Sequence, residues 1–206
     1  ADSWIKLAVI QRALRGRHNT GTIRTCLYRC LGKLLWLQWV ERRAEGIWAK
    51  LLDHSPDEWP KILKRHGVDP EGDENPVTDD EPVPKAVIEV LHDYDTTTVY
   101  RVLQDIPIRQ SATYDERVAE ARRMLADELR NVWRQCLTRL TFKLPLLVMD
   151  ESHHLKNAET RLAGLFQNPD AKNDADDIAR GALGGVFERM LFLTATPFQL
   201  GHHELC

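Results

Sequence analysis

The sequence has no long hydrophobic run, few cysteines and no large excess of charge of either sign. No apolar stretch approaches the roughly 20 residues of a membrane-spanning helix, and no signal peptide is visible. The 4 cysteines among 206 residues predict reduced thiols, because a disulfide framework needs a denser pattern. The formal net charge of −3 gives no bulk attraction to nucleic-acid phosphates. We therefore expect a globular intracellular protein, cytoplasmic or associated with nucleoid or nucleus, with any nucleic-acid contact made by local patches.

Apolar residues recur at helical spacing through much of the chain up to residue 141. In the clearest case, Val118, Leu125 and Leu129 share one stripe opposite Arg and Glu residues. Residues 96–102 fit either a strand or a continued helix, and both remain open. The periodicity predicts helices over residues 4–14, 23–52, 55–67, 85–94 and 114–140.

An acidic, proline-rich stretch interrupts this helical pattern between residues 69 and 84. Such a composition cannot bury enough apolar surface to fold alone, so it predicts a mobile loop. We expect helical regions over residues 1–68 and 85–141, an acidic linker over 69–84, and an α/β region over 142–206.

The α/β region opens with a short apolar segment that is followed by two carboxylates. In LLVMDESHHLKN, residues 146–149 form an unbroken apolar run, which predicts a strand buried on both faces of a parallel sheet. Asp150 and Glu151 follow at the carboxyl end of this strand, where open α/β sheets bind ligands. A carboxylate there can hold Mg²⁺ through water, and a neighbouring Glu can position an attacking water molecule. By itself, the pair fits an ordinary solvated strand end better than a catalytic site.

A second apolar segment ends in residues that carry hydroxyl groups. In MLFLTATPFQ, residues 191–193 are followed by Thr194 and Thr196, and Pro197 stops the strand. Between the two runs, residues 155–166 have helical spacing. The order strand, helix, strand predicts a parallel crossover whose polar ends face one crevice. The Thr-Ala-Thr-Pro segment alone fits a turn, so the combination with the first segment carries the prediction.

Together, these segments resemble motifs II and III of the superfamily-two DNA helicases and translocases, most closely the Swi/Snf-type branch. DESHHLKN is similar to the family's DEAH-type box with a Lys-Asn tail, and LFLTATPFQ is similar to its motif III. Ser152 stands where Ala is usual, and Leu200 stands where this branch often has Asn. The resemblance covers residues 144–200. It implies an α/β fold, a partial RecA-like lobe of the P-loop NTPase type preceded by a largely α-helical region.

The resemblance also implies a role for each matching residue. Asp150 would hold Mg²⁺ through water, and Glu151 would polarise the water that attacks ATP. His153 would link the nucleotide site to motif III. Thr194 and Thr196 would contact His153 and pass the nucleotide state toward the bound nucleic acid. In this family the nucleic acid is DNA. The implied function is ATP hydrolysis coupled to movement on nucleic acid, without a membrane partner.

Two parts of such a nucleotide site are missing from the sequence. There is no G-x-x-x-x-G-K-S/T loop, whose backbone N–H groups and Lys cradle phosphates. Gly32 and Lys33 are followed by Leu34, and the glycine-rich residues 181–185 precede an apolar run without a lysine. The family's second lobe, with its arginine, is absent too. We expect a piece of a larger motor, whose remainder is its partner, with little or no ATP hydrolysis by this chain alone.

Other interpretations of the helical part remain open. Basic residues of the segment 23–52 could meet phosphates, although a solvated helix face is favoured. Tryptophans of the helical part could stack on bases, although helical spacing favours core packing. Cys26 and Cys30 lie one helical turn apart and could share a metal, but without a second ligand pair they fit buried thiols better. The basic residues and tryptophans concerned are Arg24, Arg29, Lys33, Arg42, Arg43, Lys50, Trp36, Trp39, Trp48 and Trp59.

Two rival functions compete with a motor. His153, His154, His202 and His203 could suggest a metal hydrolase, but neither H-E-x-x-H nor H-x-x-E-H occurs. The stronger alternative is a non-catalytic helical module that binds nucleic acid or protein and carries a motor remnant. The intact Glu151 argues against such degeneration, whereas the missing phosphate loop argues for it.

Overall fold

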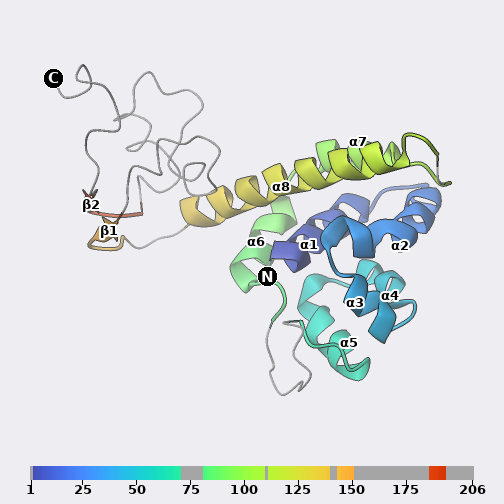
Figure 1. Cartoon of the computed structure of the whole chain (residues 1–206). Helices are drawn as coiled ribbons and strands as arrows, with labels where there is room; N and C mark the ends of the chain where they lie inside the picture. The colour runs from blue at the N-terminus through green and yellow to red at the C-terminus, as the bar shows by residue number, and fades with distance from the viewer. Residues whose placement is uncertain (1, 71–80, 110, 140–142, 151–185, 194–206) are drawn as a thin grey trace. The chain divides into compact units, whose positions relative to one another are not determined.

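The computed structural model describes residues 2–70, 81–109, 111–139, 143–150 and 186–193 (Figure 1). The chain forms two compact units, Ala1–Val132 and Trp133–Cys206, which are taken in turn. The helix predicted over residues 155–166 lies outside the described residues.

Helices build the first unit, as the spacing of its apolar residues predicts (Figure 1). They are α1 (Asp2–Leu14), α2 (Gly21–Leu35), α3 (Gln38–Arg43), α4 (Ile47–Asp53), the short 3-10 helix η1 (Pro56–Glu58), α5 (Trp59–Arg65), α6 (Lys85–Asp93), α7 (Thr97–Gln104) and α8 (Tyr114–Thr138). The segment that fitted either a strand or a helix therefore lies mainly in α7, and the extended backbone of Tyr94 separates it from α6.

The first helix, α1, lies at the centre of this unit. Trp4 is 2 % exposed, and Leu7 and Ile10 are fully buried. A helix that is apolar on most sides has to be covered on most sides, and α1 contacts α2, α4, α6 and α7. The helices before and after the acidic segment therefore share one core.

Both ends of the acidic segment 69–84 are held by this core. The indole Nε1 of Trp4 donates to the carbonyl of Pro70 at 2.9 Å, and Asp69 is 4 % exposed. At the other end, Val83 is 1 % exposed. The prediction of a mobile loop over the whole segment is therefore wrong at its ends, while residues 71–80 lie outside the described residues. Composition could not reveal the anchors, because they come from contacts between segments distant in the sequence.

The single helix predicted over residues 23–52 is wrong, since α2, α3 and α4 take its place. Trp36 caps α2 with a left-handed φ of 59°, and its N–H donates to the carbonyl of Gly32. Gly46 precedes α4 with a φ of 69°, which glycine adopts readily because it has no Cβ. The apolar periodicity runs on through both turns and therefore concealed them.

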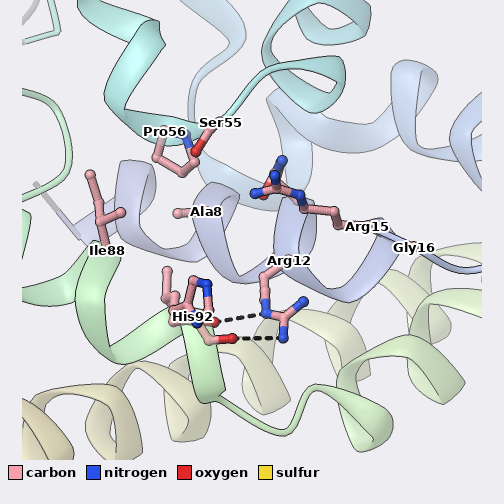
Figure 2. Close-up of a pocket in the computed structure, with 10 residues that line it drawn as sticks. Ala8, Arg12, Arg15, Gly16, Ser55, Pro56, Ile88 and His92 are labelled. Carbon is pink, nitrogen blue, oxygen red and sulfur yellow. Dashed lines mark hydrogen bonds between the residues drawn. The ribbon is translucent and has the colours of Figure 1, made fainter.

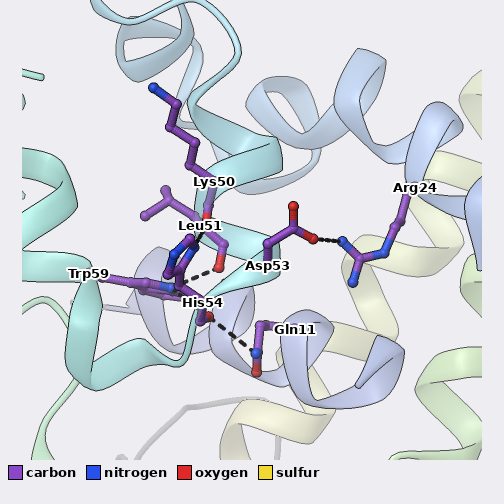
Figure 3. Close-up of polar contacts among 7 residues, drawn as sticks. All are labelled: Gln11, Arg24, Lys50, Leu51, Asp53, His54 and Trp59. Carbon is purple, nitrogen blue, oxygen red and sulfur yellow. Dashed lines mark hydrogen bonds and ion pairs between the residues drawn. The ribbon is translucent and has the colours of Figure 1, made fainter. Parts of the chain in front are cut away.

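Side chains from neighbouring elements hold the end of α4 (Figure 3). The last carbonyls of a helix have no partner within the helix. Here the indole Nε1 of Trp59 donates to the carbonyl of Leu51 at 2.8 Å, and Nδ1 of His54 lies 2.8 Å from the carbonyl of Lys50. The amide Nε2 of Gln11 donates to the carbonyl of His54 at 3.2 Å. These bonds join α1, α4 and α5 around the fully buried ring of Trp59.

The helix α8 ends two residues before the predicted range of 114–140, and one of its side chains makes a hydrogen bond within the first unit. Its Val118 and Leu125 are 1 % and 2 % exposed. The hydroxyl of Tyr94 donates to the carboxylate of Glu128. Burial and this hydrogen bond raise the pKa of Tyr94, because both disfavour its ionised form. The apolar stripe predicted from the sequence therefore does face a core.

Candidate functional site

The described part of the second unit contains a pair of short parallel strands. They are β1 (Leu147–Met149) and β2 (Met190–Phe192), and each falls on an apolar run that predicted a strand. A further parallel bridge joins Leu144 to Phe187 ahead of them. Both strand predictions and the predicted parallel direction of the two strands are therefore confirmed.

The carboxyl ends of β1 and β2 meet at one edge of the strand pair. The N–H of Leu193 donates to the carbonyl of Met149 at 2.8 Å. Met149 directly precedes Asp150, and Leu193 directly precedes Thr194. This hydrogen bond therefore joins the two backbone positions that directly precede Asp150 and Thr194. The carboxyl edge of parallel strands is where α/β proteins place their ligand sites.

Asp150 is the predicted site residue that lies within the described residues. It is exposed directly after β1. Carboxylate oxygen is a ligand that Mg²⁺ prefers, so Asp150 fits the predicted magnesium role by chemistry and by place. Glu151, His153, Thr194 and Thr196 lie outside the described residues, and their roles stay predictions.

The prediction that the first strand is buried on both faces is wrong. Leu146 is 51 % exposed, Val148 of β1 is 52 % exposed, and Leu191 of β2 is 48 % exposed. Parallel sheets in proteins are normally covered on both faces. In the described part of the unit each strand has a single neighbour, so the pair has apolar surface left to bury.

Most basic side chains of the segment 23–52 already have partners in the first unit. Figure 3 shows one such contact, in which the guanidinium of Arg24 meets the carboxylate of Asp53. Within the described structure, the exposed Arg42 and Arg43 of α3 could meet a phosphate without breaking such a contact. The other partnered side chains are Lys33 with Asp115 at 2.6 Å, Arg29 with the Ile108 carbonyl at 3.2 Å, and Lys50 with His66 at 2.9 Å.

The tryptophans of the first unit divide between core and surface. Trp48 is 2 % exposed and Trp59 is fully buried, which confirms core packing for these two. Trp36 is 64 % exposed, and Cζ of Arg122 lies 4.5 Å from the centroid of its ring. An exposed indole that is held by a guanidinium can stack on a nucleic-acid base. Helical spacing grouped Trp36 with the core, because the turn at this residue left no mark in the pattern.

Cys26 and Cys30 are buried free thiols. Cys26 is 4 % exposed and Cys30 is fully buried. Burial raises the pKa of both thiols, and that of Cys30 to about 12. A thiol with a raised pKa stays protonated at neutral pH and is a poor nucleophile and a poor metal ligand. The buried-thiol interpretation is therefore confirmed for this pair.

Reasoning from the sequence missed a basic pocket between α1, η1 and α6. It has a volume of about 420 Å³, and its lining includes Arg12, Arg15 and His92 (Figure 2). Arg12 and His92 are 80 residues apart in the chain. The amphipathic faces of α1 and α6 are visible in the sequence, but no local pattern shows that the two faces meet.

Comparison with protein-family models, with curated proteins and with solved structures finds no match to this chain. None of the helices in the described parts of the chain has the length and apolar character needed to cross a lipid bilayer. The functional interpretation therefore rests on the residues and geometry of the chain itself.

Proposed function

We propose that this chain is part of the ATP-hydrolysing lobe of a DNA-dependent ATPase, a helicase or translocase that couples hydrolysis to movement on nucleic acid. The hydrogen bond from Leu193 N–H to the Met149 carbonyl, at 2.8 Å, carries the proposal. It brings the backbone positions that directly precede Asp150 and Thr194 to one edge of a parallel strand pair. A solvated strand end and an unrelated turn would not require such pairing.

In this proposal, the residues of the chain divide the work of hydrolysis. Asp150, exposed at the end of β1, would hold Mg²⁺ through a water molecule. The bound metal would supply positive charge to the phosphates of ATP. Glu151 would orient and deprotonate the attacking water. His153 would connect this site to Thr194 and Thr196, which would relay the nucleotide state to DNA.

The exposed apolar surface of the strand pair supports a larger sheet. Val148 and Leu191, each about half exposed, are residues that further packing would cover. An open α/β lobe has helices on both faces of a sheet with several strands. We propose that the strand with the phosphate-binding loop and the second lobe belong to the remainder of the parent protein.

The proposal is tested by replacing Glu151 in the intact parent protein. Glu151→Gln keeps the size of the side chain but removes the carboxylate, so ATP turnover should fall about 10²–10⁴-fold while ATP binding persists. The matched control is Glu188→Gln, the same change at an exposed residue before β2, which should preserve both. Phosphate release and nucleotide binding are measured with DNA present. Full turnover by Glu151→Gln would reject the assignment.

A non-catalytic nucleic-acid-binding module is the second candidate, and the exposed indole of Trp36 favours it. Such a protein would bind single-stranded DNA but release no phosphate from ATP. Trp36→Ala should then weaken DNA binding by about 1–3 kcal/mol, the contribution typical of one stacked base. Arg42→Gln should instead reduce the salt dependence of binding, because it removes one phosphate contact. DNA-stimulated phosphate release by the parent would exclude this candidate.

A further inference from the structure

The pocket between α1, η1 and α6 gathers two guanidinium groups and has no carboxylate in its described lining (Figure 2). Arg12 and Arg15 supply its positive charge, and Ala8 and Ile88 are among its apolar residues. His92 also lines the pocket, and its Nδ1 lies 3.0 Å from the carboxylate of Asp93. None of the described residues that line it is Asp or Glu. The charge of its arginines is therefore not neutralised within the lining, and an anion is the ligand that this arrangement favours.

Arg12 is fixed in place before any ligand binds. Its Nε donates to the carbonyl of Leu91 and its Nη2 to the carbonyl of His92, both at 2.8 Å (Figure 2). These carbonyls lie at the end of α6, where the helix itself offers no partner. The remaining nitrogen, Nη1, bonds to no described residue and can donate to a ligand. Because folding has already ordered this side chain, ligand binding does not incur that entropic cost again.

Arg15 directly follows the last residue of α1, three residues after Arg12, and adds a second guanidinium. Its backbone N–H donates to the carbonyl of Gln11 at 3.0 Å, which continues the helical turn. Residues at this spacing are neighbours on a helix surface, and two like charges there repel each other. Arg15 is exposed, and its guanidinium bonds to no described residue. In Figure 2 its side chain extends into the space between Arg12 and Ser55. An anion with two negative charges would relieve this repulsion.

We propose that the pocket binds a small organic phosphate monoester, beyond any role of the chain in a motor. Arg12 and Arg15 would hold the phosphate through charged hydrogen bonds. Ala8, Pro56 and Ile88 would contact the organic part. The volume of about 420 Å³ lies within the range of about 300–1,000 Å³ typical of small-molecule sites. A terminal phosphate on a nucleic-acid strand has the same chemistry, so the experiment has to separate the two sources.

The test is a titration of the whole chain with phenyl phosphate, followed by NMR of the backbone amides. Saturable shifts are expected at Gly16 and Ile88, and phenol, which lacks the phosphate, should not produce them. Arg15→Gln should weaken binding at least about tenfold, because it removes a charged hydrogen bond. Its melting temperature should stay unchanged, since the guanidinium of Arg15 bonds to no described residue and the backbone hydrogen bond from Arg15 to Gln11 is kept. Arg43→Gln, the same change at an exposed residue of α3, should leave the affinity unaltered.

Equal affinity of the wild type and Arg15→Gln would overturn the proposal, and so would shifts with phenol as large as those with phenyl phosphate. A competing thymidine oligomer identifies the source of the phosphate. Competition by the 5′-phosphorylated oligomer alone would assign the site to a nucleic-acid terminus, and competition by neither form would assign it to a free small molecule. Equal competition by both forms would overturn a site for terminal phosphates.

Discussion

The guanidinium of Arg122 covers the indole ring of Trp36 and also binds the end of the helix that Trp36 caps. Its Cζ lies 4.5 Å from the ring centroid, and its Nη2 donates to the carbonyl of Lys33 at 2.9 Å. One side chain of α8 therefore satisfies a terminal carbonyl of α2 and packs against the residue whose left-handed backbone ends that helix.

Removing this guanidinium should destabilise the first unit. Arg122→Gln loses a hydrogen bond to a helix end and a cation–π contact, so the free energy of unfolding should fall by about 1–2 kcal/mol. The neighbouring Arg123 is exposed, and Arg123→Gln should change it by less than about 0.5 kcal/mol. Urea unfolding of both variants is the measurement. Equal stabilities would show that the contact contributes nothing.

Two buried tryptophans should respond differently to the same substitution. Trp59 donates to the carbonyl of Leu51 at 2.8 Å, whereas the buried Nε1 of Trp48 has no hydrogen-bond partner among the described residues. Each change to Phe removes similar volume, but Trp59→Phe also leaves a helix-end carbonyl without this donor. We expect Trp59→Phe to cost about 1–3 kcal/mol more than Trp48→Phe. Thermal denaturation of the two variants measures the difference, and a larger loss with Trp48→Phe would contradict it.

The bond between Tyr94 and Glu128 should contribute to stability at neutral pH. Tyr94→Phe leaves the partly buried carboxylate of Glu128 without this donor, at a cost of about 1–3 kcal/mol. Tyr28→Phe is the control, since Tyr28 is partly buried and its hydroxyl has no hydrogen-bond partner among the described residues. Urea unfolding at pH 7 should rank the wild type and Tyr28→Phe together, above Tyr94→Phe.

Stability should fall in alkaline solution because of the Cys30 thiol. Its pKa rises from 9.0 to about 12 on folding, so the folded state favours the protonated form. This contribution is fully present below pH 9.0 and is lost as the pH rises toward 12. At about pH 10.5 the loss is about 2 kcal/mol, since each pH unit above 9.0 costs about 1.4 kcal/mol.

Cys30→Ala isolates this effect, because alanine does not titrate. The variant should lose about 2 kcal/mol less than the wild type between pH 8 and about pH 10.5. In the native protein Cys30 should also react slowly with a thiol reagent at pH 8, and quickly once unfolded. Identical pH dependence of the two proteins would refute the assignment to Cys30.

Helices whose apolar residues recur at helical spacing were predictable from the sequence. Turns that are stabilised by residues distant in the chain were not. The apolar stripes located α1, α6 and α8 within a few residues. The break at Trp36 was missed, because glycine usually occupies a left-handed cap and because Arg122, which packs against this residue, lies far along the chain. The turn at Gly46 carried the usual local signal, which the continuing periodicity overrode.

The candidate sites show the same division. The two strands and their common edge followed from apolar runs that end in polar residues. The exposure of Val148 and Leu191 could not be predicted, because the sequence of one strand does not show how many strands pack beside it. The pocket of Arg12 and Arg15 also left no local signal, since its other side is contributed by α6 and η1.

The central position of α1 has a consequence for synthesis of the chain on the ribosome. Trp4 bonds to a carbonyl 66 residues later, and Arg12 to one 80 residues later. At about 5–20 residues per second, translation takes about 4–16 s to extend the chain from α1 to its partner α6. For that time the sides of α1 that pack on α6 and α7 lack the helices that cover them, whereas α2 and α4 are already synthesised. Nascent-chain chaperones therefore have several seconds in which α1 is open to them.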